Sequence, residues 1–289
     1  MSITLGKPGV DRLGDAVRVL REWQRDGAPV QLHPGDVGWN WRFGAEATAA
    51  AVRTWSRDGQ VLAAGMMDSP ELIRLAIAPE AQHDEELAHR LVTDLTQPER
   101  GVLPQGDVDV EARSGALLRE LLFHAGWVAG EPWTPLQRDL AQPVEDCGLR
   151  IEVTVPERAH VRAAVQRAAF ERSTFTDERW HTMAAGSPYA DARCLVAYDD
   201  HGTAVAAVTV WSAGPGRPGL LEPMGVHRDH RGHGHGTAIC LAAARALRDL
   251  GSSSATVATS SSNAAGVATY AKAGYRPLPE VPDFVLTRQ

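Results

Sequence analysis

The residues VHRDHRGHGHGT, at positions 226–237, place four histidines, two arginines and three glycines directly before a helical run, AICLAAARALRDLG. Two chemistries suit this composition. Glycines at a helix start can turn successive backbone N–H groups toward one anion, with the positive end of the helix dipole behind them. Imidazoles could instead bind a metal ion. The metal ligands would then be His227, His230, His233 and His235.

The anion-binding interpretation fits the pattern better. Gly232, Gly234 and Gly236 would let the backbone turn, Arg231 would add a charged fork, and strand, glycine turn and helix together suit a pyrophosphate. Zinc ligands need rigid elements to fix them, and four histidines in such a loop would point in several directions. We therefore expect no metal site. The expected anion-binding residues are Arg231, Gly232, His233, Gly234, His235, Gly236 and Thr237.

Two common nucleotide motifs do not match this loop, because it has neither Gly-Lys-Ser/Thr nor G-x-G-x-x-G spacing. The segment resembles instead the GNAT superfamily of acyl-CoA-dependent N-acyltransferases. That family has a strand ending in Val, here Val226, and then R/Q-x-x-G-x-G/A, here from Arg231 to Gly236. It also has an Asn, a Tyr and a Gly-aromatic pair in that order, here in NAAGVATYAKAGY at 263–275. The motifs cover about 220–277.

The resemblance implies that acetyl-CoA and an amine react to give an amide and free CoA, with no covalent enzyme intermediate. Backbone groups of Met224, Gly225 and Val226 would hold the pantetheine arm. Tyr270 matches the family's proton donor to the leaving thiolate, although it could also be a packing residue. Asn263 matches a CoA contact, and it is equally a helix N-cap.

A base must take a proton from the amine, and Glu222 is the candidate. Strand alternation would place Glu222, Met224 and Val226 on one face. A glutamate that only forms a salt bridge is the alternative, and His227 is a weaker candidate base. Side chains of the acceptor pocket would come from 170–190 and from GWNWRF at 38–43. The candidates are Phe175, Trp180, Tyr189, Trp39 and Trp41, each of which could equally be core.

The elements that position these residues occur twice. Gly126-Trp127 and Gly274-Tyr275 lie 148 positions apart, and so do Ala78 and Val226 at two strand ends. Each copy reads as strand, helices, three strands, helix, strand, helix, strand. We expect an α/β fold of two tandem GNAT-like domains, at 1–143 and 148–289, each a mixed, mostly antiparallel sheet flanked by helices. The linker would be AQPVEDCG, and the arrangement resembles that of mycothiol synthase.

The first copy lacks the glycine loop and reads PEAQHDEELAHRL at the equivalent place. Asp84, Glu85 and Glu86 would satisfy the helix start and would repel CoA. We expect this copy to bind no cofactor, to pack against the second copy and to shape the substrate cleft.

Composition excludes several classes of function. The formal charge of −7 argues against nucleic-acid binding, and no apolar run or signal-peptide pattern indicates a membrane. We expect a cytoplasmic acyltransferase that acts on a small-molecule amine. The identity of the amine and the oligomeric state of the protein stay open. The alternatives are a non-catalytic acyl-CoA sensor and a metal-binding protein that uses the histidines.

Overall fold

The computed structural model describes residues 2–287 and shows the same order of elements in both halves of the chain, apart from one more helix after the first strand of the first half and one more short strand near the end of the second. The first half contains β1 (Thr4–Gly6), α1 (Leu13–Trp23), α2 (Pro34–Asn40), α3 (Ala45–Ala51), β2 (Val52–Arg57), β3 (Gln60–Met67), β4 (Leu72–Ile77), α4 (Glu85–Thr96), β5 (Val108–Glu111), α5 (Ala116–His124) and β6 (Val128–Asp139). The second half contains β7 (Arg150–Val153), α6 (Ala159–Ala169), α7 (Asp177–Ala184), β8 (Ala192–Tyr198), β9 (Ala204–Trp211), β10 (Gly219–Val226), α8 (His235–Asp249), β11 (Ser254–Ser260), α9 (Ala264–Lys272), β12 (Arg276–Pro277) and β13 (Val281–Leu286). The predicted repeat of elements is therefore confirmed.

Local sequence explains the hairpins. In the first half, Asp58 and Gly59 join β2 to β3 with φ angles of 52° and 80°, a left-handed pair that suits a tight hairpin turn. In the second half, the Asp199 carboxylate accepts the N–H groups of His201 and Thr203 and closes the equivalent turn. Both turns lie where an Asp-Gly or His-Gly pair predicts them.

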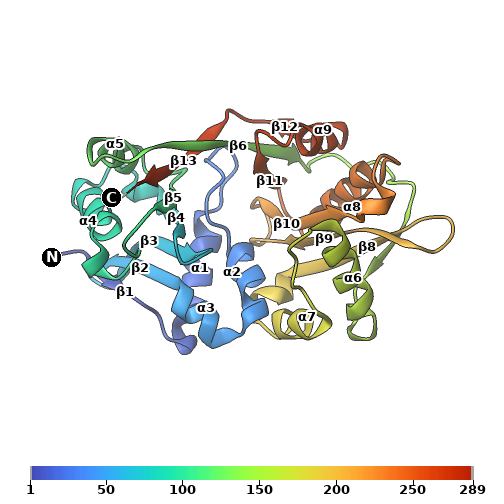
Figure 1. The fold of residues 1–289 in the computed structure, drawn as a ribbon, viewed down its shortest axis with the longest axis horizontal. Helices are drawn as coiled ribbons and strands as arrows, with labels where there is room; N and C mark the ends of the chain where they lie inside the picture. Colours follow the sequence, from blue (N-terminus) through green and yellow to red (C-terminus); the bar gives the residue numbers. More distant parts are fainter. Residues whose placement is uncertain (1, 288–289) are drawn as a thin grey trace.

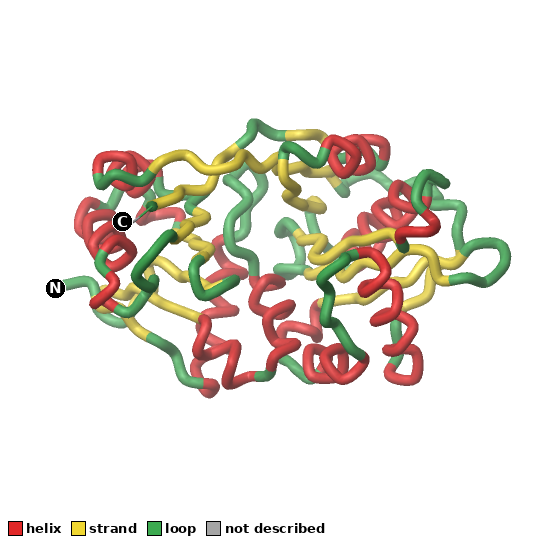
Figure 2. The backbone as a smooth tube through the Cα atoms, in the orientation of Figure 1, coloured by secondary structure: helices red, strands yellow, loops and turns green. Residues whose placement is uncertain are grey.

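Within residues 2–287 the thirteen strands form one sheet, and most neighbouring strands are antiparallel. The parallel pairs are β4 with β5 and β10 with β11. Each follows a crossover helix, α4 or α8, as a strand–helix–strand unit requires. The strands run through the middle of each half, with helices outside them (Figure 2). The predicted mixed, mostly antiparallel α/β class is confirmed.

The sequence did not indicate that the two halves exchange strands. β6 belongs to the first half by chain order, yet its second part pairs with β11 from Trp133 to Asp139. β13, the last strand of the chain, pairs with β5 and with the first part of β6. Figure 1 shows β6 running along the top of the molecule from one half to the other. The boundaries 1–143 and 148–289 stay a prediction about chain order, because in space the two halves share a sheet.

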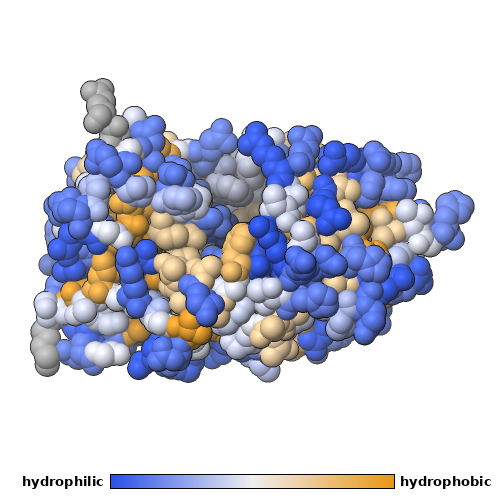
Figure 3. All heavy atoms as spheres, turned by 60° about the horizontal axis from the view of Figure 1, so that its bottom comes forward, coloured by the Kyte–Doolittle hydropathy of each residue, from blue (hydrophilic) through white to orange (hydrophobic). Residues whose placement is uncertain are grey.

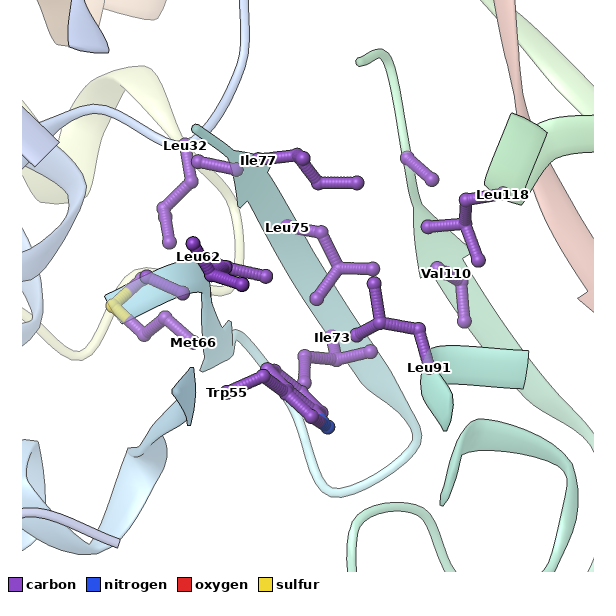
Figure 4. Packing of buried hydrophobic residues seen from close by; sticks show 14 of the residues in the cluster. Leu32, Trp55, Leu62, Met66, Ile73, Leu75, Ile77, Leu91, Val110 and Leu118 are labelled. Atoms are coloured by element: carbon purple, nitrogen blue, oxygen red, sulfur yellow. The ribbon is translucent and has the colours of Figure 1, made fainter. Parts of the chain in front are cut away.

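Each half has its own hydrophobic core. In the first half, buried side chains of β2, β3, β4 and β5 pack against α1, α4 and α5, with Trp55 and Val110 fully enclosed (Figure 4). In the second half, alternate residues of β9 face opposite ways: Val208 packs in a cluster with Ile239 of α8, and Ala207 in a cluster with Val165 of α6. Helices therefore cover both faces of the second-half strands.

The start of α2 in the first half packs directly against the second half. His33 caps α2, and its Nε2 lies 3.2 Å from the carbonyl oxygen of Pro218 in the other half. Gly35 and Gly38 of α2 lie so close to Trp211 that a Cβ on either would come within 2.5 Å of the Trp211 side chain. No helix among residues 2–287 combines the length and the apolar character needed to cross a membrane.

Candidate functional site

One edge of β10 is open next to the glycine loop. β10 pairs with β9 as far as Val226, but it pairs with β11 only through Gly219 and Leu220. β11 stays paired with β6 to Ser260, so the two strands separate beyond Leu220. Among the described residues no strand pairs with this edge from Leu221 to Val226. Its backbone N–H and C=O groups, which include those of Met224, Gly225 and Val226, are available to an extended ligand.

Strict alternation along β10 fails, and this corrects one argument from the sequence. Leu221 and Met224 pair with Val210 and Val208, which are two residues apart and share a face. Leu221 and Met224 therefore share that face although three positions separate them. The bulge between them falls at Glu222, so the expected common face of Glu222 and Met224 does not follow from spacing.

The glycine loop leads into α8 without a side-chain cap. Gly234 is the N-cap residue with φ 84°, and Gly232 has φ 81°, so both need the left-handed conformation. Both are exposed, and no side chain among residues 2–287 caps the first N–H groups of α8. Gly236 does not turn the loop, because it lies inside the first turn of α8. A Cβ on it would come within 2.8 Å of Thr269, so this glycine permits close packing of α8 on α9.

The arginines of the loop hold it against α6. Arg231 donates a 2.8 Å hydrogen bond to the carbonyl oxygen of Ala169, and Arg228 donates to the carbonyl oxygens of Ala168 and Arg167. These bonds satisfy the free C-terminal carbonyls of α6. Part of the Arg231 fork is therefore engaged, which the sequence did not indicate.

The loop histidines lie near one another at the surface. The rings of His233 and His235 stack with centroids 5.8 Å apart, and those of His227 and His230 meet edge-on at 5.1 Å. His227 Nδ1 accepts the N–H of Asp229 and thereby begins a short helical turn. Among residues 2–287, no three His, Cys, Asp or Glu side chains are grouped so that they could hold a metal ion.

The equivalent helix start in the first half is already capped. The Asp84 carboxylate accepts the N–H of Leu87 at 2.9 Å, and it receives two hydrogen bonds from the Arg57 guanidinium. A third Arg57 hydrogen bond goes to Glu86. These contacts hold the pKa of Asp84 below its usual value, chiefly through Arg57. The N-terminus of α4 thus carries its own anion, where α8 has exposed glycines.

Glu222 faces charged groups of the first half. Burial raises the pKa of Glu222 to about 7, Arg74 opposes this shift, and Asp36 and Asp68 add to it. No described side chain makes a hydrogen bond or an ion pair with its carboxylate. Arg74 itself is paired with Asp36 at 2.8 Å and with Glu111 at 3.2 Å. Glu222 is therefore a half-buried carboxylate without a partner, able to exchange a proton near neutral pH.

Tyr270 is buried in the second-half core beside Tyr275, with ring centroids 5.8 Å apart. Burial raises the pKa of Tyr270 well above its usual value, and nearby Cys240 and Glu222 add to this shift. Its hydroxyl therefore carries a proton at neutral pH, and no described residue is hydrogen-bonded to it. Asn263 caps α9: its Oδ1 accepts the N–H of Gly266 at 3.0 Å. The capping role expected as an alternative is thus present.

The aromatic candidates separate into two groups. Trp39 and Phe175 come from different halves and meet with ring centroids 5.2 Å apart, at the wall of one pocket. Trp180 and Tyr189 belong to a core cluster around Trp211. Trp41 packs against Gly186, where a Cβ would come within 2.6 Å of its ring. Figure 3 shows a recess near the middle of the molecule, between the two halves.

Sequence reasoning did not single out Arg74, Asp36 or Trp211 as residues of this region, and it named the segment 38–43 without singling out Arg42. Arg74 and Asp36 belong to the half that lacks the glycine loop, and only the packing of the halves brings them toward Glu222. A usable signal was the close spacing of Gly35 and Gly38 in α2, which marks a helix face that must approach a bulky side chain.

Known proteins support this architecture. Residues 161–275 match the model of the Acetyltransferase (GNAT) family. Comparison with curated proteins found no match. A GCN5-related N-acetyltransferase from Sphaerobacter thermophilus is 18% identical, with 99% of this chain and 95% of that one covered and a TM-score of 0.59.

Two further solved structures are similar over almost the whole chain. A tandem GNAT protein from the clavulanic acid biosynthesis pathway is 17% identical, with 99% and 98% of the chains covered and a TM-score of 0.62. A GNAT-family acetyltransferase from Colwellia psychrerythraea is 15% identical, with 99% and 100% covered and a TM-score of 0.59. These likenesses confirm the predicted fold of two tandem domains.

Proposed function

Residues 161–275 match the model of the Acetyltransferase (GNAT) family, and on this premise we propose that the protein transfers an acetyl group from acetyl-CoA to the amine of a small molecule. The observation that carries the proposal is the open edge of β10, which ends at an uncapped helix start. An elongated ligand with an anionic end suits that pair of features.

The residues present fit acetyl-CoA. Its pyrophosphate would lie against the backbone N–H groups between Gly232 and Thr237, at the positive end of the α8 dipole. The exposed glycines leave room there. The pantetheine arm would bind backbone groups of Met224, Gly225 and Val226. Bound acetyl-CoA supplies an activated acyl group as a thioester.

Glu222 and Tyr270 would handle the two protons of the reaction. Glu222, directly or through water, takes a proton from the incoming ammonium or amine. A C–N bond then forms while the C–S bond breaks, and the Tyr270 hydroxyl gives its proton to the departing sulfur. Burial raises the pKa of both groups, which suits these roles: Tyr270 keeps its proton at neutral pH, and the pKa of Glu222 is raised to about 7.

The first half would act as a wall of the acceptor site. Its α4 start is occupied by Asp84, which argues that it binds no acetyl-CoA. Arg74, Asp36 and Arg42 instead set the electrostatic surroundings of Glu222. A non-catalytic acyl-CoA sensor is the second candidate function. It would need the same cradle, but it would have no use for a titratable carboxylate beside the open strand.

The deciding experiment is calorimetric titration of acetyl-CoA into the purified protein with a zinc chelator present. We expect one site per chain. The matched variants Gly234→Asp and Gly234→Asn both tolerate the left-handed backbone and differ only in charge. We expect Asp to weaken binding at least about tenfold relative to Asn, because the carboxylate repels the pyrophosphate.

Other outcomes point elsewhere. Equal affinities in the two Gly234 variants would contradict pyrophosphate binding at the glycine loop. Two sites per chain would mean that the first half also binds acetyl-CoA. Binding without turnover across a panel of amines would favour the sensor.

A further inference from the structure

A pocket between the two halves has a cationic and aromatic lining. Three arginines and four aromatic residues line it together with uncharged polar side chains, and no Asp or Glu of the described chain is among its lining residues. The arginines are Arg42, Arg172 and Arg179, and the aromatic residues are Trp39, Phe43, Phe170 and Phe175. The whole protein is acidic, so this concentration of positive charge is local.

Both halves build the pocket. Trp39 lies at the end of α2, and Phe175 lies in the segment between α6 and α7. Their ring centroids are 5.2 Å apart, and Phe175 is buried. The Trp39–Phe175 contact thus joins the two halves at the wall of the pocket.

Arg42 is positioned to bind an anion. Its guanidinium carbon lies 4.1 Å from the Trp39 ring centroid and 4.2 Å from that of Phe43. Nη1 donates to the carbonyl oxygen of Trp39 at 2.6 Å, and no described residue accepts from its other N–H groups. Burial lowers the pKa of Arg42 to about 10, so it remains charged at neutral pH. A partly buried guanidinium with free donors is stabilised by a carboxylate ligand.

A second arginine faces the same space. The Arg179 guanidinium lies 5.1 Å from the Phe43 ring centroid, on the ring that Arg42 also contacts. It donates to the carbonyl oxygen of Thr174 at 3.0 Å, which holds it at the pocket wall. Arg42 and Arg179 therefore share one aromatic ring and repel each other, and an anion between them would relieve that repulsion.

The pocket adjoins the open strand. Phe170 lines the pocket and also lies against Gly225 of β10, where a Cβ would come within 2.8 Å of its ring. Glu222 is three residues before Gly225, and the charge of Glu222 acts on Arg42. Phe170 thus joins the pocket to β10, and Arg42 lies within reach of the charge of the proposed base.

We propose that the acceptor amine also carries a carboxylate, held by Arg42 and Arg179, with a flat apolar body between the two. The Trp39, Phe170 and Phe175 rings contact that body, and the amine reaches Glu222. The position of the amine at Glu222 rests on the proposed acetyl transfer. The binding of the carboxylate by the arginines rests only on the pocket. A polyamine would meet arginines there and would be disfavoured.

The test uses 4-(aminomethyl)benzoate and its neutral counterpart 4-(aminomethyl)benzamide, which have the same shape and amine. Binding of each to the full chain is measured by calorimetry in the absence of acetyl-CoA. We expect the carboxylate to bind at least about tenfold more tightly. Arg42→Gln and Arg179→Gln should each remove most of that difference. Arg245→Gln, an exposed arginine on α8 outside the pocket, should preserve it.

The outcomes are separable from those of the proposed reaction. Equal affinities, tighter binding of the amide, or no binding of either compound to the folded protein would overturn the inference, and so would a preference that survives in both pocket variants. Turnover is then measured with acetyl-CoA by release of the CoA thiol. Selective carboxylate binding without turnover supports the pocket and contradicts the acetyl transfer, whereas turnover of both compounds at equal kcat/KM contradicts the pocket alone.

Discussion

The indole N–H of Trp211 donates a 2.7 Å hydrogen bond to the carbonyl oxygen of Glu222. The same Trp211 ring lies against Gly35 and Gly38 of α2, in the other half of the chain. The position of the proposed base is therefore tied to a helix of the half that carries no glycine loop. This contact gives the first half a physical role in the site.

Gly38→Ala tests that tie. A Cβ there would lie 2.3 Å from the Trp211 ring, so we expect the free energy of unfolding to fall by about 1–3 kcal/mol through overpacking. Gly14→Ala in α1 is the control. It meets nothing within 4 Å and should raise stability by about 0.5–1 kcal/mol, because alanine favours helices. Urea unfolding curves measure both, and equal effects would mean that the Trp211 contact is not tight.

Glu222→Gln should lower kcat/KM by about 10²- to 10⁴-fold, since general base catalysis is lost. In the unchanged protein the rate should rise with pH through about 7, where the Glu222 carboxyl loses its proton. Asp68→Asn removes a charge that raises this pKa, so it should move the rising limb to lower pH. A pH–rate profile checks both. An unmoved limb in Asp68→Asn would assign the titration to another group.

The same group should make stability depend on pH. The pKa of Glu222 is raised from 4.5 to about 7 in the folded protein, so folding favours its protonated form. That contribution is complete below pH 4.5 and is lost as pH rises through 7. Glu222→Gln, which cannot ionise, should lose less stability over this range than the unchanged protein. Thermal unfolding at several pH values measures the difference, and parallel curves would contradict the raised pKa.

Tyr270→Phe should reduce kcat by about 10²- to 10⁴-fold while the Kd for acetyl-CoA stays unchanged, because only the proton donor is removed. Tyr275→Phe is the matched control. It breaks a 3.3 Å hydrogen bond from the Tyr275 hydroxyl to the carbonyl oxygen of Cys240. It should therefore cost about 0.5–1.5 kcal/mol of stability and leave kcat intact. Equal turnover in Tyr270→Phe would reduce Tyr270 to a packing residue.

Asp84→Ala should destabilise the protein by about 0.5–2 kcal/mol, because α4 loses its N-cap and Arg57 keeps only its bond to Glu86. The stoichiometry of acetyl-CoA binding should stay at one per chain. Glu85→Ala, in the same turn but without a capping bond, should change stability much less. If Asp84→Ala bound a second acetyl-CoA, the Asp84 cap alone would be what prevents the first half from binding the cofactor.

Much of the fold followed from local patterns in the sequence. The pairs Asp58-Gly59 and His201-Gly202 favour hairpin turns because few residues adopt left-handed φ, and helical spacing is typical of the segments that form α4, α8 and α9. The glycine loop before α8 and the capped start of α4 were equally local, since a helix end is satisfied within a few residues. For the same reason the sequence indicated which half carries the anion cradle.

Only the tertiary structure decided what surrounds the proposed base. β6 and β13 each pair with strands of the other half, and this depends on which strand edges meet. The hydrophobic pattern does not specify which strands become neighbours. The bulge at Glu222 broke the alternation that spacing predicted. The pKa of Glu222 and the free donors of Arg42 arise from burial between two halves whose residues lie far apart in the chain. Burial and long-range charge are properties of packing, so the sequence determined the kind of site, and the fold determined its acidity and its neighbours.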